Sequence, residues 1–135
     1  MPIADTEFLF ALNPKDRRHD YAIRLLKELN GLMVPDTAVL EFQAVLRARG
    51  RSPSQVRMAL LALHDILMQN GVKEVKTLSL SLLAFQSELE DRYGLSYFDS
   101  LIAASALTLD RQVVSDDEAF DRVSNLKRIP LSSTK

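Results

Sequence analysis

Five stretches with the apolar spacing of a helix alternate along this chain with apolar segments that are too short to be helices. The spacing predicts helices over residues 22–29, 38–46, 53–67, 82–93 and 97–109. The short segments between them predict strands at residues 3–4, 32–34, 72–75, 113–114 and around 129. Strands that alternate with helices build a mostly parallel sheet covered on both faces. We therefore expect an α/β three-layer sandwich, in which helices flank a short sheet of about five strands.

Local signals support several of the predicted helix ends. Ser52 followed by Pro53 is typical of a helix cap with a proline at the first helical position. Gly94 follows the pattern over residues 82–93, and Gly31 follows the pattern over residues 22–29. Glycine is favoured directly after a helix because it adopts the left-handed conformation without strain.

The composition is that of a folded protein, with 47% hydrophobic and 26% charged residues. No repeat or linker divides the 135 residues, so we expect one domain over residues 1–135, with residues 132–135 as a loose tail. The 17 basic and 18 acidic side chains nearly cancel, so any contact with nucleic acid would depend on local patches. The apolar run at residues 8–12 is too short to span a membrane. No signal peptide is recognisable either, so we expect a cytoplasmic protein without membrane contact.

The scarcity of soft metal ligands limits the chemistry. The chain has no cysteine and only two histidines, His19 and His64. This composition excludes a disulfide scaffold, a thiolate zinc site and a cysteine nucleophile. Any metal site must therefore be built from oxygen ligands.

Four acidic residues lie where a folded chain rarely places unpaired charge. Asp5 directly follows the first predicted strand, and Asp117 closely follows the strand at residues 113–114. Glu41 lies on the apolar stripe of its helix, and Asp99 lies near the start of a helix that is apolar nearly all round. Ligands of such folds bind beyond the carboxyl ends of the strands. Two carboxylates within ~4.5 Å repel by roughly 4 kcal/mol at an effective dielectric constant near 20, so four that converge call for a divalent cation.

Taken one at a time, these acids also have structural explanations as helix caps or ion-pair partners. The alternatives are a cap by Asp5 on a helix beginning at Thr6, capping boxes of Ser96 with Asp99 and of Ser115 with Glu118, an N-cap at Asp117, and an ion pair of Glu41 with Arg47. The spacing alone does not show that the four acids converge.

Four segments add a family resemblance. They are IADT at residues 3–6, PDTAVLE at 35–41, GLSYFDSLIAA at 94–104 and VVSDDEAF at 113–120. In these segments, in this order and over nearly its whole length, the chain resembles a PIN domain, the small metal-dependent ribonuclease fold. Isolated strings of this kind are common, whereas the four together are a fairly specific signal.

The resemblance implies an acidic cleft at the carboxyl end of a parallel sheet. By position its catalytic acids would be Asp5, Glu41, Asp99 and Asp117. Asp5, Asp99 and Asp117 would be ligands of Mg²⁺ or Mn²⁺, and Glu41 would bind directly or through water. Supporting positions would be Thr6 beside the first acid and Ser115 and Asp116 beside the last.

Some details of that cleft stay open in the sequence. Asp116 and Asp117 are adjacent, and only the spacing to Phe120 favours Asp117 as the fourth acid. Glu7 either faces solvent or extends the metal site.

Contact with RNA needs positive charge near these acids. Candidate contacts are Arg47, Arg49 and Arg51, with a second basic segment at residues 15–18. Arg47 and Arg49 have a structural alternative, since cations near the end of a helix complement its dipole. The nine aromatic residues fall mostly on apolar stripes, so no aromatic platform for base stacking is expected.

Several functions compete at this point. A free-standing PIN domain of this size resembles a VapC-type toxin, which implies a homodimer and a small antitoxin partner. A stand-alone RNA-processing nuclease and a non-catalytic PIN-like scaffold for RNA or protein are the alternatives. A phospho-acceptor receiver domain is disfavoured, because no lysine is suitably placed after Val114.

Overall fold

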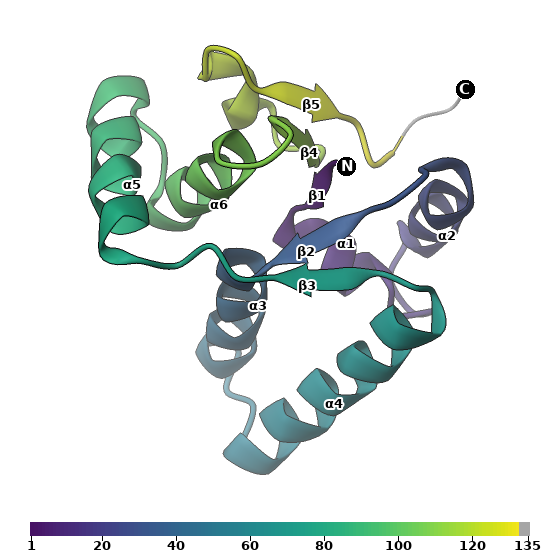
Figure 1. Ribbon diagram of the computed structural model, residues 1–135. Coiled ribbons are helices and arrows are strands. Elements are labelled where there is room, and N and C mark those ends of the chain that lie inside the picture. Colours follow the sequence, from purple (N-terminus) through teal and green to yellow (C-terminus); the bar gives the residue numbers. More distant parts are fainter. Residues whose placement is uncertain (133–135) are drawn as a thin grey trace.

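Five short parallel strands pair into one sheet in the order β3-β2-β1-β4-β5, with the N-terminal strand in the centre (Figure 1). This computed structural model describes residues 1–132. The strands are β1 (Ile3–Ala4), β2 (Met33–Pro35), β3 (Lys73–Val75), β4 (Gln112–Val114) and β5 (Lys127–Ile129). Ile3 is in register with Met33 on one side and with Val113 on the other. All four pairings are parallel, so the carboxyl ends of the strands meet at one edge.

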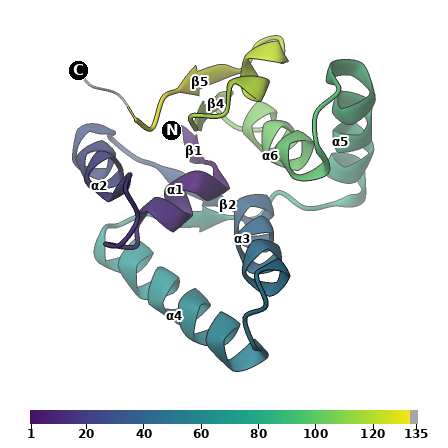
Figure 2. The same ribbon diagram turned by 180° about the vertical axis from the view of Figure 1, so that it is seen from behind.

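Helices connect the strands and flank the sheet (Figures 1 and 2). They are α1 (Thr6–Ala11), α2 (His19–Glu28), α3 (Asp36–Ala48), α4 (Pro53–Gln69), α5 (Leu80–Tyr93), α6 (Tyr97–Leu107) and the short 3₁₀ helix η1 (Glu118–Arg122). Helix α3 contacts α1, α4 and α6, and α5 packs along α6. The α/β sandwich expected from the alternating pattern is confirmed, and the sheet is parallel throughout.

The helix ends follow the local signals in the sequence. The Ser52 hydroxyl accepts a hydrogen bond from the backbone N–H of Gln55, whose side chain bonds back, with Pro53 at the first helical position. Gly94 ends α5 in the left-handed conformation at φ 65°. Three strands differ slightly from the predicted ranges. Strand β2 covers residues 33–35 instead of 32–34, β3 covers residues 73–75 instead of 72–75, and β4 covers residues 112–114 instead of 113–114.

Helix α6 has a long buried stretch in its middle. Its residues 100–106 are all buried, including Ser100 and Ser105. Ser100 accepts a hydrogen bond from the buried Gln86 amide of α5 at 2.9 Å. This packing anchors the helix that carries Asp99 in its first turn.

The last described residue is held rather than loose. The backbone N–H of Ser132 donates to the Asp116 carboxylate at 2.9 Å. Residues 133–135, the rest of the predicted tail, lie outside the described part of the chain. Among residues 1–132, no helix has both the length and the apolar character needed to cross a membrane.

Candidate active site

Asp5 lies at the carboxyl end of β1 and caps the first turn of α1. Its carboxylate accepts one hydrogen bond from the backbone N–H of Thr6 at 2.7 Å and another from the Ser115 hydroxyl at 2.6 Å. The residue is only 4% exposed. The capping alternative for Asp5 is therefore correct, and the same carboxylate also lines the pocket described below.

Ser115 and Asp117 follow the neighbouring strand β4. The buried Ser115 hydroxyl donates to Asp5 and accepts from the backbone N–H of Asp117 at 2.9 Å. Asp117 in turn caps η1, because its carboxylate accepts from the backbone N–H of Ala119 at 2.9 Å. Asp117 is thus the N-cap that the sequence suggested, whereas Ser115 is engaged with Asp5 and Asp117 rather than with Glu118.

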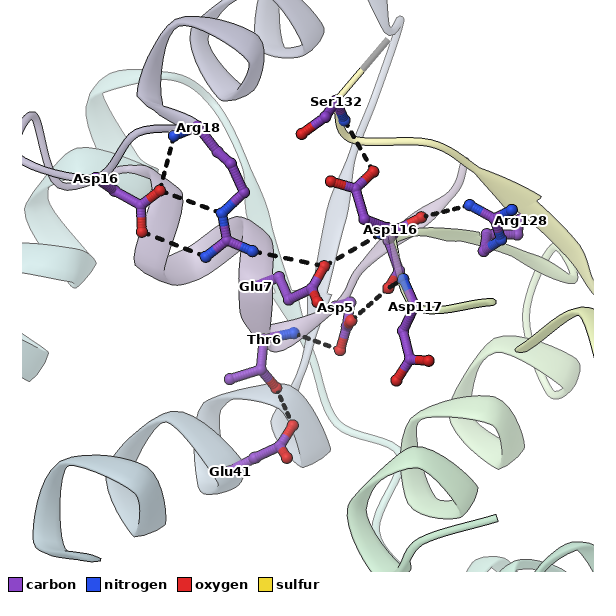
Figure 3. Close-up of polar contacts among 11 residues, drawn as sticks. Asp5, Thr6, Glu7, Asp16, Arg18, Glu41, Asp116, Asp117, Arg128 and Ser132 are labelled. Atoms are coloured by element: carbon purple, nitrogen blue, oxygen red, sulfur yellow. Dashed lines mark hydrogen bonds and ion pairs between the residues drawn. The ribbon is translucent and has the colours of Figure 1, made fainter. Parts of the chain in front are cut away.

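Glu41 and Asp99 reach the same place from two helices. The Thr6 hydroxyl donates to Glu41, which projects from α3 toward α1 (Figure 3). In this arrangement Glu41 bonds Thr6 instead of forming the ion pair with Arg47 that the spacing allowed. Asp99 lies in the first turn of α6, where its backbone N–H donates to the Ser96 hydroxyl at 3.2 Å.

All four predicted acids line one pocket of about 350 Å³. The other residues around this acidic pocket are Thr6, Glu7, Phe10, Asp16, Arg18, Val45 and Arg49. Six of its side chains are carboxylates and two are guanidinium groups. The structure therefore brings together four acids that are far apart in the sequence, because the junction of β1 and α1, helices α3 and α6, and the segment between β4 and η1 each contribute one carboxylate.

Burial and neighbouring carboxylates raise the pKa of Asp5, Glu41 and Asp99. Burial, together with the nearby Glu7 and Glu41 carboxylates, raises the pKa of Asp5 to about 7, although the Ser115 and Thr6 hydrogen bonds act in the opposite direction. Burial also raises the pKa of Asp99 to about 6, with a further contribution from the adjacent Asp117 carboxylate. Burial is the main reason that the pKa of Glu41 is raised as well. The pocket therefore concentrates negative charge without enough hydrogen-bond donors to stabilise it.

Asp116 points to a different part of the surface from Asp117. Its carboxylate accepts from Ser132, and its backbone N–H donates to Glu7 at 3.1 Å (Figure 3). Glu7 also lies 3.7 Å from the Arg18 guanidinium in an ion pair. Asp117 lines the acidic pocket and Asp116 does not. Glu7 also lines the acidic pocket, next to Asp5, so its side chain does not simply face solvent.

The three arginines predicted to contact RNA differ in whether they line the acidic pocket. Arg49 lines the acidic pocket, whereas Arg47 and Arg51 do not. Glu41 and Val45 of α3 and Arg49, which caps the C-terminal end of that helix, follow one another at intervals of four residues, a spacing that was readable in the sequence. Arg18 also lines the pocket, and it is clamped by Asp16 through contacts of 3.2 and 3.3 Å. Asp16 and Phe10 were not predicted, because nothing in the local sequence shows that the loop before α2 folds back over α1.

The donor set suits a hard cation. The four acids offer only oxygen atoms, which Mg²⁺ and Mn²⁺ prefer. Within residues 1–132, no group of three or more acidic or histidine side chains is already arranged to hold one ion together. Mg²⁺ usually keeps several waters and binds through only one or two carboxylates, so a pocket of separated carboxylates fits it.

Comparison with family models matches residues 3–126 to the PIN domain. No curated protein sequence matches the chain. The fold is similar to several solved structures of low sequence identity. One is VapC20 of Mycobacterium tuberculosis, described as a sarcin-ricin loop cleaving toxin, at 21% identity and a TM-score of 0.70, covering 90% of this chain and 93% of that one.

Two further similar structures are complexes. A toxin–antitoxin complex from Klebsiella pneumoniae has a TM-score of 0.68 at 15% identity, covering 98% of both chains. VapBC2 from Rickettsia felis, bound to a DNA fragment from its promoter, has a TM-score of 0.67 at 19% identity. That comparison covers 95% of this chain and 96% of the other. At these identities the likeness establishes a shared fold.

Proposed function

Because the chain belongs to the PIN domain family, we propose that it is a metal-dependent endoribonuclease that hydrolyses RNA phosphodiester bonds. The observation that carries the proposal is the convergence of Asp5, Glu41, Asp99 and Asp117 on one pocket. This pocket lies beyond the carboxyl ends of β1 and β4, where open parallel sheets bind their ligands. Nearby carboxylates with raised pKa values are typical of functional sites.

Each acid has a proposed role. Asp5 and Asp99 would bind Mg²⁺ or Mn²⁺ directly, and Glu41 and Asp117 would bind directly or through water. Such an ion supplies an activated water for attack on phosphorus and stabilises the charge that develops on the phosphoryl oxygens. Ser115 fixes the orientation of the Asp5 carboxylate through its hydrogen bond. Thr6 does the same for Glu41.

We extend the proposal to a biological role as the toxin of a type II toxin–antitoxin pair. The similar folds of VapC20 and of two toxin-containing complexes, which cover nearly the whole chain, support this role. It assigns the protein an RNA substrate, a small antitoxin partner and a cytoplasmic location. Expression of the wild-type protein in a bacterial host should arrest growth, whereas the Asp99→Asn variant should not.

A homodimer is part of the same proposal. Leu78, Leu80 and Leu83, at the beginning of α5, are all exposed, and Leu80 is 89% exposed. Exposed apolar side chains grouped in this way are typical of an interface. Sedimentation equilibrium of the pure protein should give twice the 15.2 kDa chain mass, and Leu80→Asp should shift it to the monomer. A wild-type protein that sediments as a monomer at all concentrations would contradict the dimer.

The first experiment is cleavage of a mixed RNA pool by the pure protein. Cleavage should occur with Mg²⁺ or Mn²⁺, stop with EDTA and disappear in Asp99→Asn. Asp65→Asn is the matched control, because this acid is exposed on α4 and lies outside the acidic pocket. It should cleave like the wild type.

Two outcomes of this experiment would contradict the proposed function. Cleavage that persists in EDTA would exclude a metal-dependent site, and cleavage that persists in Asp99→Asn would exclude this pocket. Absence of both cleavage and Mn²⁺ binding by calorimetry would favour the non-catalytic scaffold.

A further inference from the structure

The two cations of the acidic pocket differ in how they are held. Arg18 is half-buried and already engaged by two carboxylates, those of Asp16 and Glu7. Arg49 is exposed and, within residues 1–132, forms no ion pair. Arg49 instead contacts an aromatic ring, because its guanidinium carbon lies 4.9 Å from the centroid of the Phe10 ring. Arg49 is therefore the pocket cation that remains available to a ligand.

Phe10 is itself fixed from behind. Its ring centroid lies 4.6 Å from that of Phe42, with the planes inclined by 34°. Phe42 is only 6% exposed and belongs to the core. The three side chains form a stack that runs from the core through the half-buried Phe10 to the exposed guanidinium. A guanidinium supported in this way loses little further freedom when a flat group binds to it.

The position of this stack relative to the acids decides what can bind there. Arg49, the C-cap of α3, follows Glu41 by eight positions, which corresponds to about 12 Å at the rise of an α-helix. Arg49 thus lies beyond the proposed hydrolytic centre. The pocket between them is lined by carboxylates, which repel a second phosphate but do not repel the uncharged face of a nucleobase.

We infer that the guanidinium of Arg49, supported by Phe10, is a stacking platform for one nucleobase of a single-stranded RNA that crosses the acidic pocket. Unpaired RNA bases commonly stack on aromatic rings and on arginine guanidinium planes. The inference rests on the proposed function for the identity of the ligand. It revises the expectation that the chain has no stacking platform, because the half-buried Phe10 reaches the pocket and the arginine provides the exposed surface.

The test uses short single-stranded RNAs in which the fluorescent base 2-aminopurine occupies each position in turn. Binding is measured in EDTA with the Asp99→Asn protein, so that the RNA stays intact. Stacking should quench 2-aminopurine at one position or at two adjacent positions. Arg49→Lys keeps the charge and removes the plane. It should abolish the quenching and weaken binding about tenfold, while the salt dependence of binding is unchanged.

The matched control is Arg92→Lys. Arg92 also lies over an aromatic ring, 5.7 Å from the Tyr93 centroid, but it is outside the acidic pocket. This substitution should change neither quenching nor affinity. An abasic nucleotide at the quenched position should weaken binding to the parent protein, Asp99→Asn with Arg49 intact. It should leave binding to the Arg49→Lys variant nearly unaffected, since the missing base and the missing guanidinium remove the same contact.

The stacking inference is overturned if no position is quenched, if Arg49→Lys quenches like its parent, or if Arg49→Lys weakens intact and abasic RNA equally. These results are separate from those that decide the proposed function. Metal-dependent cleavage without quenching removes only the stacking site. Quenching that depends on Arg49 in a protein that never cleaves RNA removes the nuclease and retains the site.

Discussion

Asp5 and Asp36 occupy equivalent places on two neighbouring strands, yet their carboxylates meet opposite environments. Asp5 follows β1 and Asp36 follows β2, each at the beginning of a helix. Asp36 accepts hydrogen bonds from the backbone N–H and hydroxyl of Thr77 and from the backbone N–H of Leu78, at 2.7 to 3.1 Å. Although burial alone would raise the pKa of Asp36, these bonds hold it below its usual value. Burial raises the pKa of Asp5 to about 7.

The difference separates a structural acid from a candidate functional one. The donors around Asp36 stabilise its charge and attach the segment after β3 to the start of α3. The Thr77 hydroxyl also contacts that of Ser105 on α6 at 2.8 Å, and Ser105 contacts Thr37 in the same way. Asp5 has fewer donors and more carboxylate neighbours, so its charge is left for a cation to balance. A position at the end of a strand is therefore insufficient to identify a functional acid. The number of hydrogen-bond donors around the carboxylate, relative to neighbouring carboxylates, distinguishes the functional acid from the structural one.

The largest effect should come from neutralising Asp5. Asp5→Asn removes a proposed metal ligand, so we expect RNA cleavage to fall about a thousandfold, the upper end of the range for loss of one electrostatic contact to a transition state. Calorimetry should show weaker Mn²⁺ binding. An unchanged Mn²⁺ affinity would return Asp5 to a purely capping role.

The pH dependence of stability should be the next largest effect. The pKa of Asp5 is about 7 in the folded protein against 3.8 as the unperturbed value. The folded state therefore binds more protons between these values, and the metal-free protein should lose stability as pH rises from about 4 to about 7. The loss is up to roughly 4 kcal/mol for a shift of this size.

Asp5→Asn supplies the control for this pH effect. Urea unfolding in EDTA should show a much flatter pH dependence in the variant, and Mn²⁺ should restore stability to the wild type at pH 7. A wild-type protein whose stability increases steadily over this range would contradict the assignment.

Asp36→Asn should reduce stability and leave Mn²⁺ binding intact, in contrast to Asp5→Asn. Loss of hydrogen bonds to a charged acceptor should lower the free energy of unfolding by about 2 kcal/mol at pH 7. Mn²⁺ affinity should be unaffected, because Asp36 does not line the acidic pocket. Urea denaturation and calorimetry measure the two quantities, with Asp65→Asn as the control for neutralising an acid. A large loss of Mn²⁺ affinity in Asp36→Asn would remove the distinction between the two regions.

The smallest expected effect separates two buried serines, Ser115 beside Asp5 and Ser105 in the region of Asp36. Ser115→Ala removes the hydroxyl that orients Asp5, and we expect Mn²⁺ affinity to fall about tenfold, as for other residues that orient a metal ligand. Ser105→Ala removes the hydroxyl that joins Thr37 and Thr77, and it should leave Mn²⁺ affinity unchanged. Equal effects of the two substitutions on Mn²⁺ binding would show that Ser115 acts only through the fold.

Local chemistry explains why much of the fold was predictable. The cap at Ser52 and Pro53 and the stop at Gly94 depend on neighbouring residues alone, and both were predicted correctly. Apolar spacing similarly predicted α2 to α6 and a mostly parallel sheet, whereas α1 and η1 were not among the helices predicted from spacing. Strand ends were less accurate, because backbone pairing between distant segments determines where a short strand stops.

The site was less predictable, because it depends on contacts between distant segments. The resemblance suggested four acids, but their meeting depends on contacts such as that of Ser115 with Asp5, 110 residues apart. Asp16 and Arg18 reach the pocket from the loop before α2, and Phe10 reaches it from α1. The environment of Asp36 also escaped prediction, since its donors come from a segment 41 and 42 residues later.

The central place of β1 in the sheet has a consequence for synthesis. β1 is made first, but one of its two neighbours is β4, which begins at Gln112. A growing chain on the ribosome therefore cannot bring Ser115 and Asp117 to Asp5 until Ser115, which lies 110 residues after Asp5, and Asp117 have emerged. Contacts of such long separation form late in folding. The nascent protein is thus unable to assemble its acidic pocket while only the segments from β1 to β3 have been synthesised.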